Sequence, residues 1–297
     1  MKRAAIPFRG IIPPMVTPFR ADEELDEEAF RREVAFHLEA GVHGLSIGGS
    51  TGEGAMMRDD ELKRAWTAAK QEIKGRVPLI AGIIRDSTRD AVACSLIARE
   101  VGVDALMVTP VHYFKPTDDG MYEFYATLAT RTGLPIIIYN VVPFNPVSPE
   151  LLCRLVEIEQ VAGIKQSGGD IHSLAEMVRL VGHEAVVMSA VDDLLLASLV
   201  IGAHGALAGT CALLPRQCVD LYEAVAKGDL DRARRLHELM LPLVRATIFG
   251  VRNYPAGVKE AITMMGRPVG RARSPLTAPT AAEKERLRAI LKSASLV

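Results

Sequence analysis

The sequence has little of what marks a disulfide scaffold or a metal centre. Only four of its 297 residues are cysteines, and none forms a CxxC pair. We therefore expect reduced thiols rather than a redox pair or a zinc knuckle. The seven histidines form no HxH or HExxH pattern, so we expect no catalytic metal. A metal-dependent aldolase stays open as an alternative, because ligands distant in the sequence can meet in the folded chain.

Long apolar runs and an excess of one charge are also missing. No uninterrupted apolar run approaches the roughly 20 residues that a membrane helix needs. The first ten residues, MKRAAIPFRG, lack the apolar core of a signal peptide. The formal net charge is −1, which gives no field to attract nucleic acid or an anionic membrane. We therefore expect a soluble, cytoplasmic protein with neither of these as a partner.

What the chain does contain is a regular alternation of short apolar runs with longer amphipathic stretches. The runs are continuous, which is typical of parallel strands that are covered on both faces. The eight runs are GIIPPMV near the N-terminus, GLSIG at 44–48, VPLIAGII at 77–84, ALMVTP at 105–110, LPIIIYN at 134–140, VAGIK at 161–165, AVVMSA at 185–190 and GALAG at 205–209.

Helix signals fill the gaps between these runs. Ser87 and Thr88 begin one amphipathic stretch as candidate N-caps, and Ser148 precedes another with Pro149 at its first helical position. Eight strand–helix units in roughly 225 residues predict an α/β fold of the (β/α)8 TIM barrel type. A doubly wound sheet is the alternative, but its nucleotide-binding GxGxxG is absent. We expect a barrel over 1–227 and a C-terminal helical extension over 228–297.

Reactive side chains stand where several of these runs end. Catalytic groups of such barrels lie at the C-terminal ends of the strands. Lys165 ends the sixth run, Tyr139 lies at the end of the fifth, and GGSTGEG with Ser50 and Thr51 ends the second. We therefore expect these side chains to meet in one pocket.

Together these groups suit imine chemistry. Burial disfavours the charged form of an amine, and a neutral lysine can attack a ketone to form a Schiff base. Tyr139 offers a phenol that can give and take a proton, and the glycine-rich turn can bind a carboxylate through its hydroxyls and N–H groups. Taken singly, each has an ordinary structural explanation, as a snorkelling lysine, a core tyrosine or a capped turn.

Three motifs carry a resemblance to a known family. With GGSTGE at 48–53, YNVVP at 139–143 and GIKQSGGD at 163–170, the sequence resembles the dihydrodipicolinate synthase/N-acetylneuraminate lyase family over nearly its whole length. The resemblance implies a class I lyase that acts on pyruvate or another 2-oxo acid, in some cases with an aldehyde. It implies no cofactor beyond the lysine Schiff base, and an assembly of identical subunits, either a dimer or a tetramer.

The resemblance also assigns roles to residues. Lys165 takes the place of the nucleophile and Tyr139 that of the proton shuttle, while Ser50 and Thr51 take that of the carboxylate-binding pair. A further catalytic tyrosine that reaches in from a neighbouring subunit corresponds to Tyr113, with His112 as the alternative. The remaining substrate-binding positions that we predict are Gly49, Ser167, Ala190, Asp192 and Leu207.

The sequence departs from the family's pattern at two places. No arginine follows YNVVPFNPVS, whereas the lysine-pathway synthases usually have one there for the aldehyde's carboxylate. Gly209 replaces a serine that is common in sialic acid lyases. Asp192 and Asp193 stand where those lyases have two acids that bind the sugar's hydroxyl chain, and the alternative is that they only begin a helix and complement its dipole. Phe114 and Phe144 suggest a partly apolar second-substrate pocket. The reaction stays open between aldol cleavage or condensation, dehydration and dihydrodipicolinate synthesis, with a non-catalytic keto-acid-binding barrel as the remaining alternative.

Overall fold

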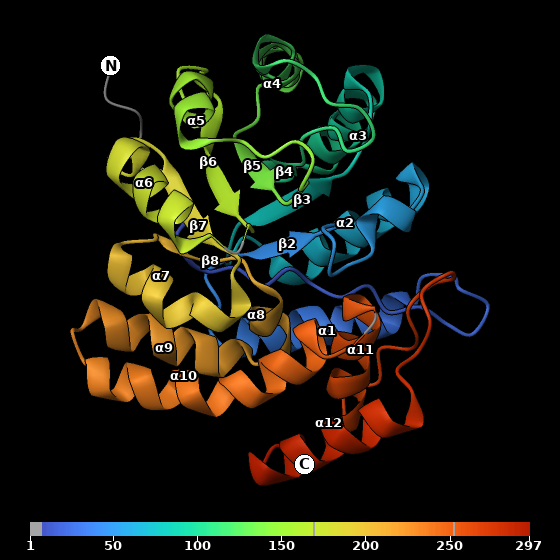
Figure 1. The fold of residues 1–297 in the computed structure, drawn as a ribbon. Coiled ribbons are helices and arrows are strands. Elements are labelled where there is room, and N and C mark those ends of the chain that lie inside the picture. The colour runs from blue at the N-terminus through green and yellow to red at the C-terminus, as the bar shows by residue number, and fades with distance from the viewer. Residues whose placement is uncertain (1–7, 169, 252) are drawn as a thin grey trace.

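A computed structural model describes residues 8–168, 170–251 and 253–297. Gly169 of the predicted GIKQSGGD motif and the first seven residues of the predicted barrel domain lie outside the described residues. Figure 1 shows a ring of strands surrounded by helices, with the C-terminal helices packed together on one flank. Among the described residues, no helix combines the length and the apolar character that crossing a membrane requires.

The strands of the described chain coincide with the eight apolar runs. They are β1 (Gly10–Ile11), β2 (Leu45–Ile47), β3 (Leu79–Ile83), β4 (Ala105–Val108), β5 (Ile136–Asn140), β6 (Val161–Gln166), β7 (Val186–Ser189) and β8 (Gly205–Ala206). All pair in parallel in the order β1-β8-β7-β6-β5-β4-β3-β2.

The ring closes between the two ends of this order. Just after β1, Pro14 forms a parallel bridge with Ser46 of β2. The N–H of Met15 donates to the carbonyl of Ser46 at 2.8 Å, and the N–H of Ser46 donates to that of Pro13 at 3.0 Å. The prediction of a (β/α)8 barrel is confirmed, and the doubly wound alternative is wrong.

Helices follow the strands and cover the outside of the ring. They are α1 (Glu27–Glu39), α2 (Asp59–Ile73), α3 (Thr88–Val101), α4 (Asp118–Thr132), α5 (Pro149–Leu155), α6 (Ile171–Val181), α7 (Leu195–Ile201), α8 (Gly209–Leu213) and α9 (Pro215–Ala226), with 3₁₀ turns η1 (Gly54–Met56) and η2 (Asp192–Leu194). The predicted caps are confirmed: Ser87 accepts from the N–H of Asp90, and Ser148 from that of Leu151.

Beyond Lys227 the described residues form helices. These are α10 (Leu230–Val244), the π-helical segment η3 (Arg245–Phe249), α11 (Tyr254–Met264) and α12 (Ala281–Ser293). In Figure 1, α10 runs alongside α9, and α11 lies next to α8. The domain division at Lys227 stays a prediction.

An irregularity in β6 determines where Lys165 points. The register of β6 against β5 shifts between Val161 and Gly163, so that Ala162 is an extra residue. Val161 and Ile164 both pack in the outer core between strands and helices, although they are three positions apart. Without the extra residue, alternation along the strand would place them on opposite faces. The shift therefore directs Lys165 to the inner face.

A glycine allows this strand to lie close to its neighbour. A Cβ atom on Gly163 would lie 2.1 Å from the carbonyl oxygen of Val186 on β7. Any side chain there would push the two strands apart. The glycine of the VAGIK run is thus needed by the packing of β6 on β7, two residues before the lysine.

Candidate active site

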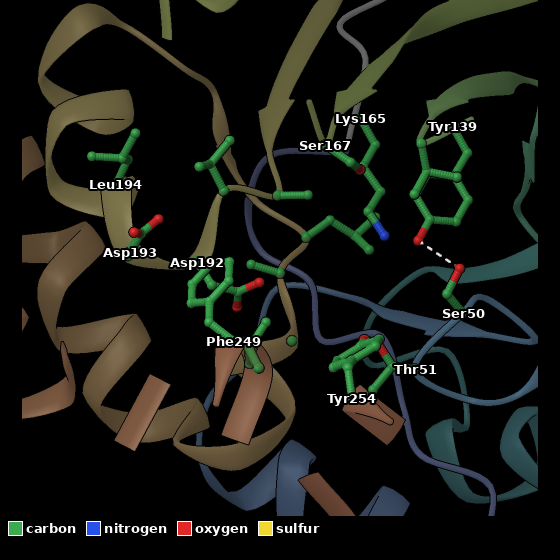
Figure 2. Close-up of a pocket in the computed structure, with 17 residues that line it drawn as sticks. Ser50, Thr51, Tyr139, Lys165, Ser167, Asp192, Asp193, Leu194, Phe249 and Tyr254 are labelled. Atoms are coloured by element: carbon green, nitrogen blue, oxygen red, sulfur yellow. Dashed lines mark hydrogen bonds between the residues drawn. The ribbon is translucent and has the colours of Figure 1, made fainter. Parts of the chain in front are cut away.

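A cavity of about 490 Å³ lies at the C-terminal end of the barrel. The ends of β2, β5, β6, β7 and β8 contribute to it, and so does the C-terminal extension (Figure 2). Its lining comprises Ser50, Thr51, Tyr139, Val141, Lys165, Ser167, Ala190, Val191, Asp192, Asp193, Leu194, Leu207, Ala208, Gly209, Ile248, Phe249 and Tyr254. A space of this size accommodates a small organic substrate.

Lys165 is almost completely buried in this cavity, with 3% of its surface exposed. It pairs in register with Tyr139 of β5, and its Nζ lies 3.7 Å from the centre of the Tyr139 ring. The face of an aromatic ring attracts an ammonium group. The lysine that ends the apolar run is therefore held inside the barrel mouth rather than extended to solvent.

Tyr139 connects the lysine to the glycine-rich turn after β2. Its hydroxyl donates to Oγ of Ser50 at 3.0 Å, and Figure 2 shows this bond beside the lysine amine. Tyr139 is 4% exposed. Amine, phenol and hydroxyl thus meet in one enclosed volume, an arrangement in which a proton can move between heteroatoms.

Thr51 has a different partner, which comes from the C-terminal extension. Its Oγ1 forms a hydrogen bond with the hydroxyl of Tyr254, at the start of α11. Burial raises the pKa of Tyr254 well above its ordinary value. This phenol therefore keeps its proton at neutral pH.

Acidic groups occupy the side of the cavity across from Tyr139 and Ser50. Oδ1 of Asp192 accepts from both the N–H and the hydroxyl of Thr210, each at 2.6 Å. Burial raises the pKa of Asp192, while the bonds from Thr210 oppose the shift. Figure 2 shows Phe249 beside Asp192, with Asp193 further out. This side thus offers carboxyl oxygens next to an apolar ring.

A buried ion pair fixes the turn that carries Ser50 and Thr51. Glu53 has a left-handed backbone with φ of 57°, and its Oε1 lies 2.5 Å from Nζ of Lys259 on α11. Both side chains are at most 1% exposed. The other oxygen of Glu53 accepts from the backbone N–H of Arg273 at 2.7 Å. The C-terminal extension therefore holds the turn in place.

Comparison with known proteins agrees with this geometry. The model of the dihydrodipicolinate synthetase family matches residues 7–294. A 4-hydroxy-tetrahydrodipicolinate synthase from Thermodesulfovibrio yellowstonii is 34% identical over 98% of this chain and 99% of its own length. The chain belongs to the dihydrodipicolinate synthetase family. As the sequence predicted, it is a lyase of the Schiff-base-forming type, and the non-catalytic alternative has no support.

Solved structures of the same family superpose closely. Dihydrodipicolinate synthase from Thermotoga maritima aligns with a TM-score of 0.93 at 32% identity, covering 98% of this chain and 100% of that one. A prophage protein of the dihydrodipicolinic acid synthase family from E. coli K12, solved in complex with pyruvate, aligns with a TM-score of 0.93 at 27% identity, covering 98% and 99%. The barrel and its extension are thus common to this family.

Most of the predicted site residues come together in the cavity. The lining includes Lys165, Tyr139, Ser50, Thr51, Ser167, Ala190, Asp192 and Leu207. Gly49, which directly precedes Ser50 in the turn, is not among the described residues that line the cavity. The catalytic and binding roles of all these residues remain predictions.

The loop after β4 lies outside the cavity of this chain. Tyr113 is 79% exposed, and its ring packs edge-on against that of Phe114. Nε2 of His112 lies 2.8 Å from Oδ2 of Asp86, and His112 lines a smaller neighbouring cavity of about 230 Å³. The predicted role of Tyr113 requires a second subunit and stays a prediction. Phe114 and Phe144 are likewise exposed, and neither is among the described residues that line the larger cavity.

Sequence reasoning missed the residues that the extension contributes. Ile248 and Phe249 from η3 and Tyr254 from α11 form one wall of the cavity. Their apolar and aromatic character is ordinary for helices, and no strand end marks them. A tyrosine directly before a proline at a helix start was the one local signal, and it says nothing about a contact with Thr51.

Proposed function

We propose that this chain binds pyruvate or a related 2-oxo acid and forms a Schiff base with it through Lys165. The observation that carries the proposal is the buried amine of Lys165 against the ring of Tyr139, inside a cavity of about 490 Å³. A salt-bridged lysine would be the ordinary alternative, but no carboxylate of the described residues forms an ion pair with Lys165 within 4.0 Å.

The chemistry follows from the position of an amine beside a phenol. The amine adds to the ketone carbon, and the ketone oxygen is protonated and leaves as water, which gives a protonated imine. Loss of a proton from the adjacent carbon gives an enamine. The enamine attacks an aldehyde carbon, whose oxygen takes up a proton, and water then hydrolyses the imine to free Lys165. The same steps in reverse cleave an aldol.

Tyr139 is the proposed proton carrier in these steps. Its hydroxyl is hydrogen-bonded to Ser50, which can pass a proton onward. Ser50 and Thr51 are the proposed ligands of the substrate carboxylate, because two hydroxyls and the N–H groups of a tight turn suit an anion. No further cofactor is required, since the imine itself withdraws the electrons.

Two candidate reactions, which differ in the second substrate, have support from different observations. The name of the Thermodesulfovibrio yellowstonii relative supports 4-hydroxy-tetrahydrodipicolinate synthesis. The cavity supports an aldol lyase for a neutral, hydroxylated aldehyde, because the described residues of its lining include Asp192 and Asp193 but no arginine. Once Lys165 is an imine, the lining residues that the structure describes offer no further lysine or arginine for a second carboxylate.

Two assays separate these candidates. Rescue of a diaminopimelate-requiring strain by this chain supports the synthase, whereas pyruvate release from a 2-keto-3-deoxy sugar acid without rescue supports the aldol lyase. Asp193→Asn should then raise the KM for the sugar acid several-fold. An enzyme that does neither, and that consumes no pyruvate with any aldehyde, contradicts the proposal.

We further propose that the active enzyme is a cytoplasmic homo-oligomer. The exposed aromatic residues of the loops beside the cavity support this, since Tyr113, Phe114 and Phe144 are each at least 75% exposed. Analytical ultracentrifugation should find a dimer or tetramer. Tyr113→Phe should lower turnover in that assembly if the tyrosine reaches a neighbouring site, and unchanged turnover would count against its role.

A further inference from the structure

The C-terminal extension contributes a hydroxyl directly to the proposed carboxylate site. Tyr254 stands at the first turn of α11, lines the cavity that contains Lys165, and hydrogen-bonds Thr51. Figure 2 shows the two side chains together below the lysine and away from the Tyr139–Ser50 pair. The turn after β2 thus has two neighbouring hydroxyls, and each is paired with a different tyrosine.

The position of Tyr254 is fixed from both sides. On the barrel side, a Cβ atom on Gly209 would lie 3.2 Å from Cε2 of Tyr254 and 3.0 Å from Cδ1 of Ile248. The absence of a side chain at Gly209 therefore leaves room for both residues of the extension. A serine at this position, as noted for sialic acid lyases, would crowd the tyrosine ring.

The second anchor is the ion pair between Glu53 and Lys259. Glu53 lies two residues after Thr51, and Lys259 lies five residues after Tyr254 on the same helix. The turn and α11 are thus joined at two points, one of which is a buried charge pair at 2.5 Å. A phenol on such a support has little freedom to leave Thr51, which is what a preorganised site requires.

We propose that Tyr254 is a positioning residue for the carboxylate of the 2-oxo acid. Its hydroxyl donates to Oγ1 of Thr51, which leaves the Thr51 proton to donate to a carboxylate oxygen of the substrate. A chain of donors that ends on an anion is stronger than a single neutral bond. Burial raises the pKa of Tyr254, so the phenol has a proton to donate. This inference rests on the proposed function.

The test compares two ketones in Tyr254→Phe. Borohydride trapping is measured against concentration with pyruvate, and with hydroxyacetone, which keeps the ketone but lacks the carboxylate. We expect the half-saturating pyruvate concentration to rise about tenfold, as for loss of one bond that supports an anion, with the hydroxyacetone curve unchanged. Tyr222→Phe, whose ring packs on His43 in a different part of the fold, is the matched control and should change neither curve.

A double mutant shows whether Tyr254 acts through Thr51. Thr51→Val should show the same selective loss for pyruvate, and Tyr254→Phe in that background should add nothing further. If Tyr254→Phe fails to fold, Thr51→Val alone remains as the test of this bond, and it must raise the half-saturating concentration of pyruvate but not that of hydroxyacetone. Equal losses for both ketones, or an unchanged pyruvate curve, would overturn the role of Tyr254. A wild-type enzyme that traps no 2-oxo acid would overturn the proposed function itself, and this inference with it.

Discussion

Glu53 and Lys259 form an ion pair at 2.5 Å that is closed to solvent, although one follows β2 and the other lies in the C-terminal extension. Burial lowers the pKa of Lys259, and Glu53 counteracts that shift. Lys259 also donates to the carbonyl of Arg271 and lies over the ring of Phe19. The extension is thus bound to the turn that carries Ser50 and Thr51.

Removing one partner of this pair should be costly. Glu53→Gln leaves a buried ammonium group without its counter-charge. We expect the free energy of unfolding, measured by urea titration, to fall by about 3–5 kcal/mol. The double variant Glu53→Gln with Lys259→Met should recover part of this loss. Glu28→Gln, which breaks the exposed pair between Glu28 and Arg32, is the control and should cost less than about 1 kcal/mol. Equal effects of the two single variants would contradict the role of the buried pair.

Tyr139→Phe should separate binding from proton transfer. We expect kcat to fall by about 10²–10⁴, the usual range for loss of a general acid or base. Far-ultraviolet circular dichroism should stay unchanged, because the ring remains. Ser50→Ala removes the acceptor of the same bond, so the losses from the two substitutions should combine to less than their product in steady-state kinetics. Independent, multiplicative losses would show that Ser50 and Tyr139 do not share a proton path.

The burial of His37 should lower the free energy of unfolding when the pH falls. It is fully buried in α1, its ring nitrogen Nδ1 bonds the carbonyl of Glu33, and burial lowers its pKa from 6.5 to about 4. The folded state therefore binds this proton less readily than the unfolded chain does. The stabilisation from neutral His37 is complete above pH 6.5 and is lost as the pH falls toward 4.

His37→Leu should remove that dependence. Between pH 7 and pH 5 the variant should lose about 2 kcal/mol less unfolding free energy than the wild type, measured by urea titration at each pH. The carboxyl of Glu33, whose pKa burial raises to about 7, acts in the opposite direction in both proteins, so only the difference between them is diagnostic. His183→Leu, at an exposed position, should match the wild type. Parallel curves for wild type and His37→Leu would contradict the account.

The sequence predicts those parts of the site that depend on local pattern. Lys165, Tyr139 and Ser50 could be found because each stands at the end of an apolar run, and a barrel brings the ends of its strands together. The caps Ser87 and Ser148 could be found because a capping bond spans only three residues.

Other parts depend on packing between distant segments and left no local signal. The extra residue Ala162 in β6, which turns Lys165 inward, is visible only as a register between two strands. Tyr254 and Lys259 look like ordinary helix residues in the sequence. Their partners, Thr51 and Glu53, lie in the turn after β2, near the other end of the chain. Long-range pairs of this kind are specified by the whole fold rather than by any window of sequence.

Whether Lys165 forms the Schiff base can be read directly from borohydride reduction in the presence of pyruvate, followed by peptide mass spectrometry. We expect a reduced pyruvyl adduct on the peptide that contains Lys165, none on the peptide that contains Lys259, which is also buried, and no adduct or turnover in Lys165→Ala. An adduct on another lysine, or full turnover by Lys165→Ala, would contradict this expectation.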